Sequence, residues 1–276
     1  MTIAERSVNS FRELQLARFR VSVLKQAKWR ELSRAAGETH GKRALDVGTD
    51  NGVIALLFRE RGGEWTSADR STQAVDAICQ TLGEPVAQLR DAALPFPDAS
   101  FDLIVIADML EHVADDRAML AEVARCLKVG GRAIVNVPHL KPWGVLPPLR
   151  RALGLTDAWH GHLHAGYDER SLRALLPRTM RLAATRDYVR FFSYALDTAL
   201  NAAGARRTAR SDADNDRPVT SAQRAMYPAM RAFAALDALL PFTRGYMLVA
   251  TLERTPDVGD RPGLGEPVYR GDAEQR

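Results

Sequence analysis

The chain has 276 residues, 46% of them hydrophobic and 26% charged, with a formal net charge of +4. This balance is typical of a soluble globular protein and excludes a wholly disordered chain. No run of about 18 apolar residues occurs, and residues 1–15 lack the apolar segment of a secretory signal, so we expect neither a membrane-spanning helix nor export. Cys79 and Cys126 lie far apart without a CxxC partner, which predicts buried thiols in a reducing compartment.

Positive charge is concentrated near the N-terminus. Residues 1–45 contain ten Lys or Arg and four Glu, a local excess of six positive charges. Apolar residues at helical spacing predict one long helix over 8–35, closed by Gly37, so that 1–37 form a basic N-terminal helix segment. Its basic face is either simply solvated or meets an anionic membrane or an acidic substrate, and we expect no specific nucleic acid partner.

From residue 43 onward, short apolar runs rich in β-branched residues alternate with helical patterns. The predicted strands are 43–48, 64–69, 85–91, 101–108 and 132–138. The predicted helices between them are 52–62, 72–83 and 115–131, the last ended by two glycines. This alternation predicts an α/β fold of βαβ units, with a mostly parallel sheet and helices on both faces.

The pattern changes after residue 139. A segment rich in Pro, Gly, Trp and His predicts a cap over 140–170, followed by a helix, a sixth strand, two amphipathic helices and a last strand. These elements are 171–177, 181–192, 191–204, 228–242 and 245–254. Pro228 suits the first turn of its helix, and the polar segment 205–224 reads as a linker. The predicted organisation is a domain over 38–254, with a helical insertion over 191–241 and a disordered tail over 255–276.

The candidate ligand site lies where the first strand runs into a helix. Gly48 permits a tight turn at the strand end, and Gly52 lets a ligand approach free backbone N–H groups at the helix start. Asp69 closes the second predicted strand and Asp91 the third, with Ala92 beside it. Carboxylates at neighbouring strand ends suit a cationic ligand with hydroxyl groups, such as a ribose. Each acid taken singly could instead be a helix N-cap.

These motifs carry a family resemblance. LDVGTDNG, SAD, RDAALPFPDASFDLIVIADMLEHV and LKVGGRAIVNVPH resemble the successive motifs of class I S-adenosylmethionine-dependent methyltransferases, in the methyltransferase type 11 and ubiquinone-biosynthesis-like group. The resemblance covers 43–139 closely. It implies a Rossmann-like, doubly wound, seven-stranded sheet of order 3-2-1-4-5-7-6, with S-adenosyl-L-methionine as cofactor. The implied cofactor contacts are Asp46, Gly48, Thr49, Asp50, Gly52, Asp69, Arg70, Asp91, Ala92, Ala107 and Asp108.

Two functions follow from the resemblance. The first is a methyltransferase that moves a methyl group to an O, N or C atom of a small or lipid-linked metabolite. The alternative is a catalytically inactive binding or scaffold module, because Asp50 stands where the family loop usually has glycine. A nicotinamide dehydrogenase is disfavoured, since the loop lacks G-x-G-x-x-G.

Histidines supply the candidates for acceptor chemistry. His139 ends the fifth predicted strand and is the candidate general base, whereas His112 reads as structural. His160, His162 and His164 alternate, and a metal site is one interpretation. Since no carboxylate or cysteine sits at ligand spacing, we expect no metal. The resemblance favours substrate contacts by His160, His162 and Tyr167.

The sequences of the two amphipathic helices allow two locations for the protein, in solution or at a membrane surface. Their apolar stripes are Phe191, Phe192, Leu196 and Leu200, and Met226, Met230, Phe233, Leu236 and Leu240. They either pack on the sheet as core or form a lid that dips into an anionic bilayer to reach a lipid-linked acceptor. We expect a cytoplasmic protein, and the second interpretation adds a peripheral position on the inner face of the membrane.

Overall fold

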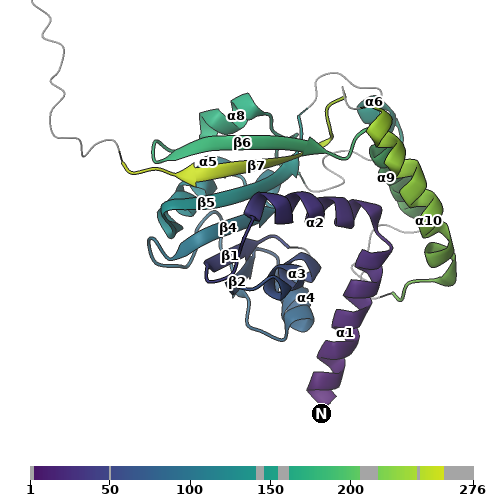
Figure 1. The fold of residues 1–276 in the computed structure, drawn as a ribbon, viewed down its shortest axis with the longest axis horizontal. Coiled ribbons are helices and arrows are strands. Elements are labelled where there is room, and N and C mark those ends of the chain that lie inside the picture. Colours follow the sequence, from purple (N-terminus) through teal and green to yellow (C-terminus); the bar gives the residue numbers. More distant parts are fainter. Residues whose placement is uncertain are drawn as a thin grey trace, which may run out of the picture.

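A seven-stranded sheet forms the centre of the protein (Figure 1). The computed structural model describes residues 3–49, 51–140, 146–154, 162–205, 217–240 and 243–257. The strands are β1 (Arg43–Val47), β2 (Glu64–Asp69), β3 (Ala87–Gln88), β4 (Phe101–Ala107), β5 (Leu127–Pro138), β6 (Met180–Tyr188) and β7 (Met247–Arg254). Their order is β3-β2-β1-β4-β5-β7-β6, which confirms the predicted topology.

Strands β1 to β5 are parallel, and β7 runs antiparallel to both of its neighbours. The carboxyl ends of the parallel strands therefore meet at one edge of the sheet, where open α/β sheets bind their ligands. The helices are α1 (Ile3–Arg20), α2 (Val23–Ala36), α3 (Val53–Glu60), α4 (Thr72–Leu82), η1 (Leu110–His112), α5 (Asp116–Cys126), α6 (Leu146–Ala152), α8 (Glu169–Leu175), α9 (Phe191–Ala205), α10 (Ser221–Ala235) and η3 (Leu236–Leu239).

The sheet is covered on both faces, and β4 shows how its sequence achieves this. Leu103 and Val105 point to a cluster that includes residues of α2 and α3. Ile104 and Ile106 point to the opposite cluster, which includes residues of α5 and α8. All four are fully buried, because successive side chains of a strand alternate between its faces.

The N-terminal segment is two helices, so the prediction of one helix over 8–35 was wrong. Ser22 adopts an extended conformation between α1 and α2, and its hydroxyl accepts a hydrogen bond from the backbone N–H of Lys25. This N-cap starts a second helix in a new direction. Gly37 ends α2 with a φ of 66°, as its sequence position predicted.

Other element boundaries also differ from the predictions, and the sixth strand, predicted over 181–192, ends at Tyr188. The third strand is only Ala87–Gln88, so Asp91 does not close it and lies instead in the turn at 90–93. Helix α5 ends at Cys126, and the glycines at 130 and 131 lie inside β5 rather than ending a helix. Pro228 lies in the interior of α10, because the capping box of Thr220 and Gln223 starts that helix seven residues before the predicted start.

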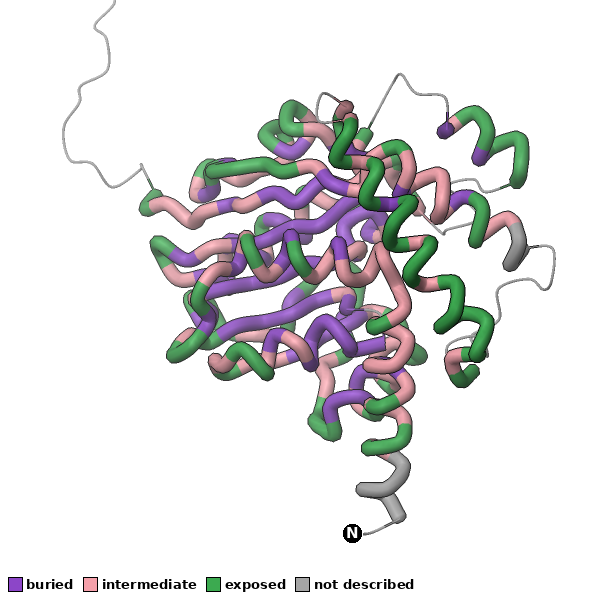
Figure 2. The backbone as a smooth tube through the Cα atoms, turned by 45° about the vertical axis from the view of Figure 1, so that its right-hand side comes forward, coloured by how far each residue is buried: buried purple, intermediate pink, exposed green. Residues whose placement is uncertain are grey.

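Helices α9 and α10 lie outside the sheet layers, between β6 and β7 in the sequence (Figure 1). They contact each other, and both contact α2. Phe192 and Phe233 join them edge to face, with ring centroids 5.3 Å apart. Figure 2 shows α10 as a largely exposed helix. Among the described residues, no helix is long and apolar enough to cross a membrane.

Candidate active site

Gly48 marks the tightest point of the site, directly after β1. Its φ is 77°, and a Cβ atom there would lie 2.6 Å from the carbonyl oxygen of Ala107 and 2.7 Å from Cβ of Met109. Only glycine fits this position, because both the backbone conformation and the space exclude a side chain. The loop after β1 is thereby pressed against the end of β4, at the edge where ligands of such sheets bind.

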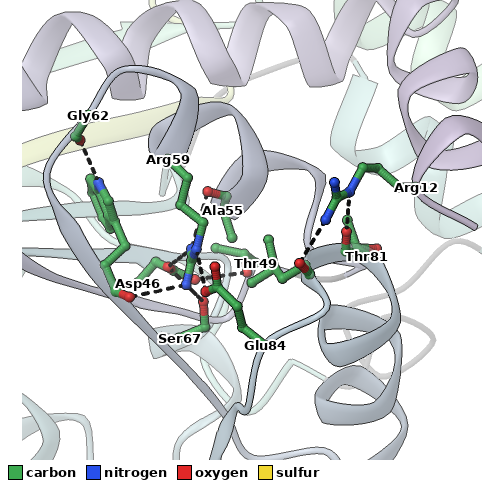
Figure 3. A network of polar contacts seen from close by, with 11 residues as sticks. Arg12, Asp46, Thr49, Ala55, Arg59, Gly62, Ser67, Thr81 and Glu84 are labelled. Carbon is green, nitrogen blue, oxygen red and sulfur yellow. Dashed lines mark hydrogen bonds and ion pairs between the residues drawn. The ribbon is translucent and has the colours of Figure 1, made fainter. Parts of the chain in front are cut away.

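Asp46 contacts the first part of this loop through Thr49 (Figure 3). Its side chain is fully buried. Its Oδ1 accepts a hydrogen bond from Thr49, and its Oδ2 accepts hydrogen bonds from Ser67 and Arg59, at 3.2, 2.9 and 3.2 Å respectively. Burial raises the pKa of the Asp46 carboxyl, and the charge of Arg59 opposes the rise. Asp46 therefore braces the loop from within, and a direct contact with the cofactor stays a prediction.

Arg59 of α3 connects that helix to Asp46 of β1, to Trp65 of β2 and to Glu84 after α4. Beyond Asp46, it donates to the carbonyl oxygens of Ala55 and Trp65 and to the carboxylate of Glu84 (Figure 3). Its side chain is only 15% exposed. Arg59 was not predicted as a site residue, because nothing in its local sequence pattern distinguishes it from a solvated helix residue.

The N-terminal helices hold the second half of the loop. Gly52 starts α3 with a φ of 81° and packs closely on α4. Asn51 donates a hydrogen bond to Gln15 of α1 and lies 3.4 Å from Nζ of Lys25 of α2. Predicted site residue Asp50 lies outside the described residues. Thus α1 and α2, interpreted from sequence only as a basic segment, contact the ligand loop directly.

Residues after β2 and β3 complete this side of the edge. Asp69 is buried, and its Oδ1 accepts a hydrogen bond from the backbone N–H of Ser71 at 2.9 Å. Arg70 donates to the carbonyl oxygen of His112. Asp91 is exposed in its turn, with a φ of 54°, and Ala92 is half-buried beside it. A left-handed conformation at a non-glycine residue is uncommon and often marks a functional site.

A polar chain crosses the end of β4. Asp108 has a φ of 52°, and its carboxylate receives hydrogen bonds from Lys28 of α2 and Asn136 of β5. The hydroxyl of Tyr188 in turn donates to Oδ1 of Asn136 at 2.7 Å. Burial, followed by the charge of Asp108, raises the pKa of Tyr188 well above its usual value, so this tyrosine acts as a neutral donor.

Glu111 lies one turn further, on η1, and is almost completely buried. Its Oε2 has no hydrogen-bond partner among the described residues. Burial and the nearby charge of Asp108 raise the pKa of Glu111 to about 8. One carboxylate oxygen of Glu111 and one ring nitrogen each of His112 and His162 lie within 4.8 Å of one another. The sequence spacing gave no sign that a carboxylate lies beside His162.

Two of the remaining predicted residues lie side by side after β5, because the backbone of His139 pairs with that of Tyr167. His139 follows β5, and its Nδ1 is 2.9 Å from the carbonyl oxygen of Gly245. Since a carbonyl only accepts, Nδ1 carries the proton and Nε2 of the neutral ring has a lone pair. Tyr167 is buried, and its hydroxyl donates to Asp116 at 3.0 Å, so it braces η1 and α5, and a substrate contact stays a prediction. His160 lies outside the described residues.

Comparison with known proteins shows which proteins the segment around this site is similar to. Residues 45–135 match the protein family described as "Methyltransferase domain". A demethylmenaquinone methyltransferase of Tropheryma whipplei is 34% identical over 119 residues, which cover 42% of this chain and 50% of that protein. A ubiquinone/menaquinone biosynthesis C-methyltransferase of Stenotrophomonas maltophilia is 41% identical over 105 residues, covering 34% and 42%.

The chain thus spans about half the length of the curated relatives that it matches. The fold of the chain is similar to that of a solved S-adenosylmethionine-dependent methyltransferase from Mesorhizobium loti. That structure has a TM-score of 0.55 and 18% identity, and covers 83% of this chain and 98% of its own. At this level of identity, the agreement concerns the fold.

Proposed function

We propose that the protein is an S-adenosyl-L-methionine-dependent methyltransferase that acts on a small, lipid-linked acceptor of the quinone class. The observation that carries the proposal is the loop at Gly48, which sits against the end of β4 within the segment that matches the methyltransferase family. The acceptor class comes from the relatives, whose names state methyl transfer in menaquinone and ubiquinone biosynthesis.

The residues at the strand ends fit this cofactor chemically. S-adenosyl-L-methionine is a sulfonium cation with a ribose diol and supplies an activated methyl group. Asp69 and Asp91 offer carboxylates for hydroxyl and amino groups, and Gly48 and Gly52 keep the backbone free of side chains. Asp108 lies next to Ala107 at the same edge, with its carboxylate held by Lys28 and Asn136.

His139 is the proposed proton acceptor for the reaction. Its Nδ1–H is held by the Gly245 carbonyl, which fixes the tautomer and leaves Nε2 as the basic atom. An acceptor hydroxyl, or a ring carbon that must lose a proton, would give that proton to Nε2. Since methyl transfer depends chiefly on positioning, His139→Ala should slow turnover while leaving the affinity for S-adenosylhomocysteine unchanged.

Contact with an anionic membrane belongs to the same proposal, because a lipid-linked acceptor resides there. Helices α9, α10 and η3 carry exposed apolar side chains, namely Phe191, Leu200, Met226, Phe233, Leu236 and Leu239. Their packing on each other and on α2, rather than in the sheet core, leaves this surface open to a bilayer interface.

Calorimetric titration with S-adenosyl-L-methionine and S-adenosylhomocysteine tests the proposal. We expect both to bind, and Asp69→Ala to weaken them about 10-fold or more, because a hydrogen bond to a charged group contributes about 1.5–3 kcal/mol. Asp76→Ala, at an exposed position of α4, is the matched control and should change nothing. Absence of binding at millimolar concentration would overturn the proposal. Tight binding without turnover of any quinone-class acceptor would favour an inactive binding module.

A further inference from the structure

An open pocket of about 480 Å³ lies where the corner between α1 and α2 meets α10. This volume is in the range of small-molecule sites. Figure 1 shows α10 alongside this corner, at the side of the molecule away from β2 and α4. The residues that line the pocket are Phe19, Arg20, Gln26, Trp29, Arg30 and Tyr227.

The pocket is held in shape by hydrogen bonds and ring packing. Nε2 of Gln26 donates to the carbonyl oxygens of Phe19 and Arg20, both at 3.0 Å, and so closes the end of α1. The hydroxyl of Tyr227 donates to Oε1 of Gln26 at 2.9 Å, which joins α10 to the corner. Trp29 packs edge to face on the buried ring of Phe58, with centroids 4.9 Å apart. These contacts preorganise the walls.

Two guanidinium groups at this pocket are weakly compensated. Arg20 is exposed and forms no ion pair within the described part of the chain. Arg30 is 67% exposed, and the one ion pair that it forms with a described residue is a 3.7 Å contact with Glu31. Glu31 is already engaged at shorter distances by Arg186 and Arg34. Both guanidinium groups are therefore available to an anion.

The surrounding segments have the same sign of charge. Residues 18–30 and 217–235 together contain eight Lys or Arg and no Asp or Glu. Such a field attracts anions to this side of the molecule.

The pocket is separate from the methyl-transfer site. Lys25 and Lys28 of α2 contact Asn51 and Asp108 at the strand ends. Gln26 and Trp29 follow them by one residue each, and one residue rotates a helix position by about 100°. The pocket therefore occupies a different face of α2 from the one that closes the ligand loop.

We propose that this pocket binds an organic phosphate with an apolar body. Two guanidinium groups match the charge of about −2 that a phosphate monoester carries near pH 7, and each guanidinium forms bidentate hydrogen bonds with phosphate oxygens. The rings of Phe19, Trp29 and Tyr227 form the apolar walls. The phosphate lies between the arginines, and the apolar part lies against the rings. Two sources share this chemistry, a lipid headgroup and a soluble aryl phosphate.

Calorimetry on the full chain tests the proposal with three probes. These are dihexanoyl phosphatidic acid below its micelle concentration, phenyl phosphate and inorganic phosphate. We expect one saturable site for at least one organic phosphate, with inorganic phosphate at least 10-fold weaker. The organic phosphate that binds more tightly identifies the source, and either result supports the proposal. Inorganic phosphate binding as tightly as both organic probes, or no saturable binding of either, would overturn it.

Variants of α1, α2 and α10 assign the binding to the pocket. The double substitution Arg20→Gln with Arg30→Gln should weaken the organic phosphate at least 10-fold. Arg224→Gln with Arg231→Gln removes the same number of charges from exposed positions of α10 that do not line the pocket, and this variant should stay within 3-fold of the parent. Equal loss in both variants would show a diffuse charge effect and overturn the assignment. Titration with S-adenosylhomocysteine in each variant reports separately on the methyl-transfer site.

Discussion

Individual residues with left-handed backbone conformations mark the ligand edge of this sheet. Gly48, Gly52, Asp91 and Asp108 all have φ between 52° and 81°, and all follow a parallel strand or its loop. For a non-glycine residue this conformation is unfavourable by roughly 1–2 kcal/mol. It persists at Asp108 because Lys28 and Asn136 hold the carboxylate. The strain is therefore compensated by contacts that shape the site.

Gly48→Ala separates backbone strain from steric overlap. We expect it to lower the free energy of unfolding by about 3 kcal/mol or more, because strain adds to overpacking against Ala107 and Met109. Gly41→Ala is the matched control, since Gly41 has a φ of 70° and a Cβ atom there would have no heavy atom within 4 Å. This control should lower the free energy of unfolding by only about 1 kcal/mol. Urea unfolding of both variants measures the difference. Equal losses in the two variants would contradict the close approach at Gly48.

Glu111 makes the free energy of unfolding depend on pH. Its pKa is raised to about 8 from an ordinary value near 4.5, so the folded state holds a proton that the unfolded state releases between these values. The contribution of Glu111 to stability is complete below pH 4.5 and falls as the pH rises toward 8. The stability of Glu111→Gln relative to the parent should therefore increase from pH 5 to pH 8, measured by urea unfolding.

The control for this effect is Glu60→Gln, at an exposed position of α3. Its stability difference from the parent should not follow pH in this way. A Glu111→Gln difference that stays constant between pH 5 and pH 8 would show that Glu111 is ionised in the folded protein, stabilised by Lys28.

At the scale of elements, the sequence predicted what depends on local pattern. The strand 64–69 was predicted from the alternation of strands and helices, and the end of α2 from Gly37, and the structure places both there. The break at Ser22 and the early start of α10 were missed, because a single capping residue overrides a continuous helical periodicity. The candidate site was predicted from its strand-end acids, whereas Lys28, Arg59 and Gln15 reach the same strand ends through tertiary packing that spacing does not reveal.

The cap at Ser22 is what directs α2 toward the strand ends. Ser22→Ala removes the hydrogen bond to the N–H of Lys25 and should lower the free energy of unfolding by about 1 kcal/mol. Ser33→Ala, further along the same helix, removes only a bond to the carbonyl oxygen of Arg30 and should be neutral or slightly stabilising. Thermal unfolding of both variants checks the difference. An equal effect would mean that the α1–α2 corner is fixed by packing alone.

At the scale of the whole molecule, charge and exposed apolar surface coincide on one side. The sheet strands bury most of their apolar residues, whereas α10 is largely exposed (Figure 2). The basic segment 18–30 lies beside the basic segment 217–235, which contains α10. The hydrogen bond between Tyr227 and Gln26 joins the two segments. A surface with both properties suits an anionic bilayer, because apolar insertion and electrostatic attraction then act together.

Co-sedimentation with liposomes tests this arrangement. We expect the protein to bind anionic liposomes and not neutral ones, with binding lost as salt rises, because each basic residue near the surface contributes roughly 1 kcal/mol that salt screens. Met226→Asp with Leu239→Asp should abolish it, since these side chains are 55% and 69% exposed on α10 and η3. Val129→Asp is the matched control, because Val129 is 60% exposed on β5 and lies outside this surface. A protein that stays in the supernatant with both liposome types at low salt would contradict membrane contact. Equal losses in both variants would show that the exposed side chains of α10 and η3 do not carry the binding.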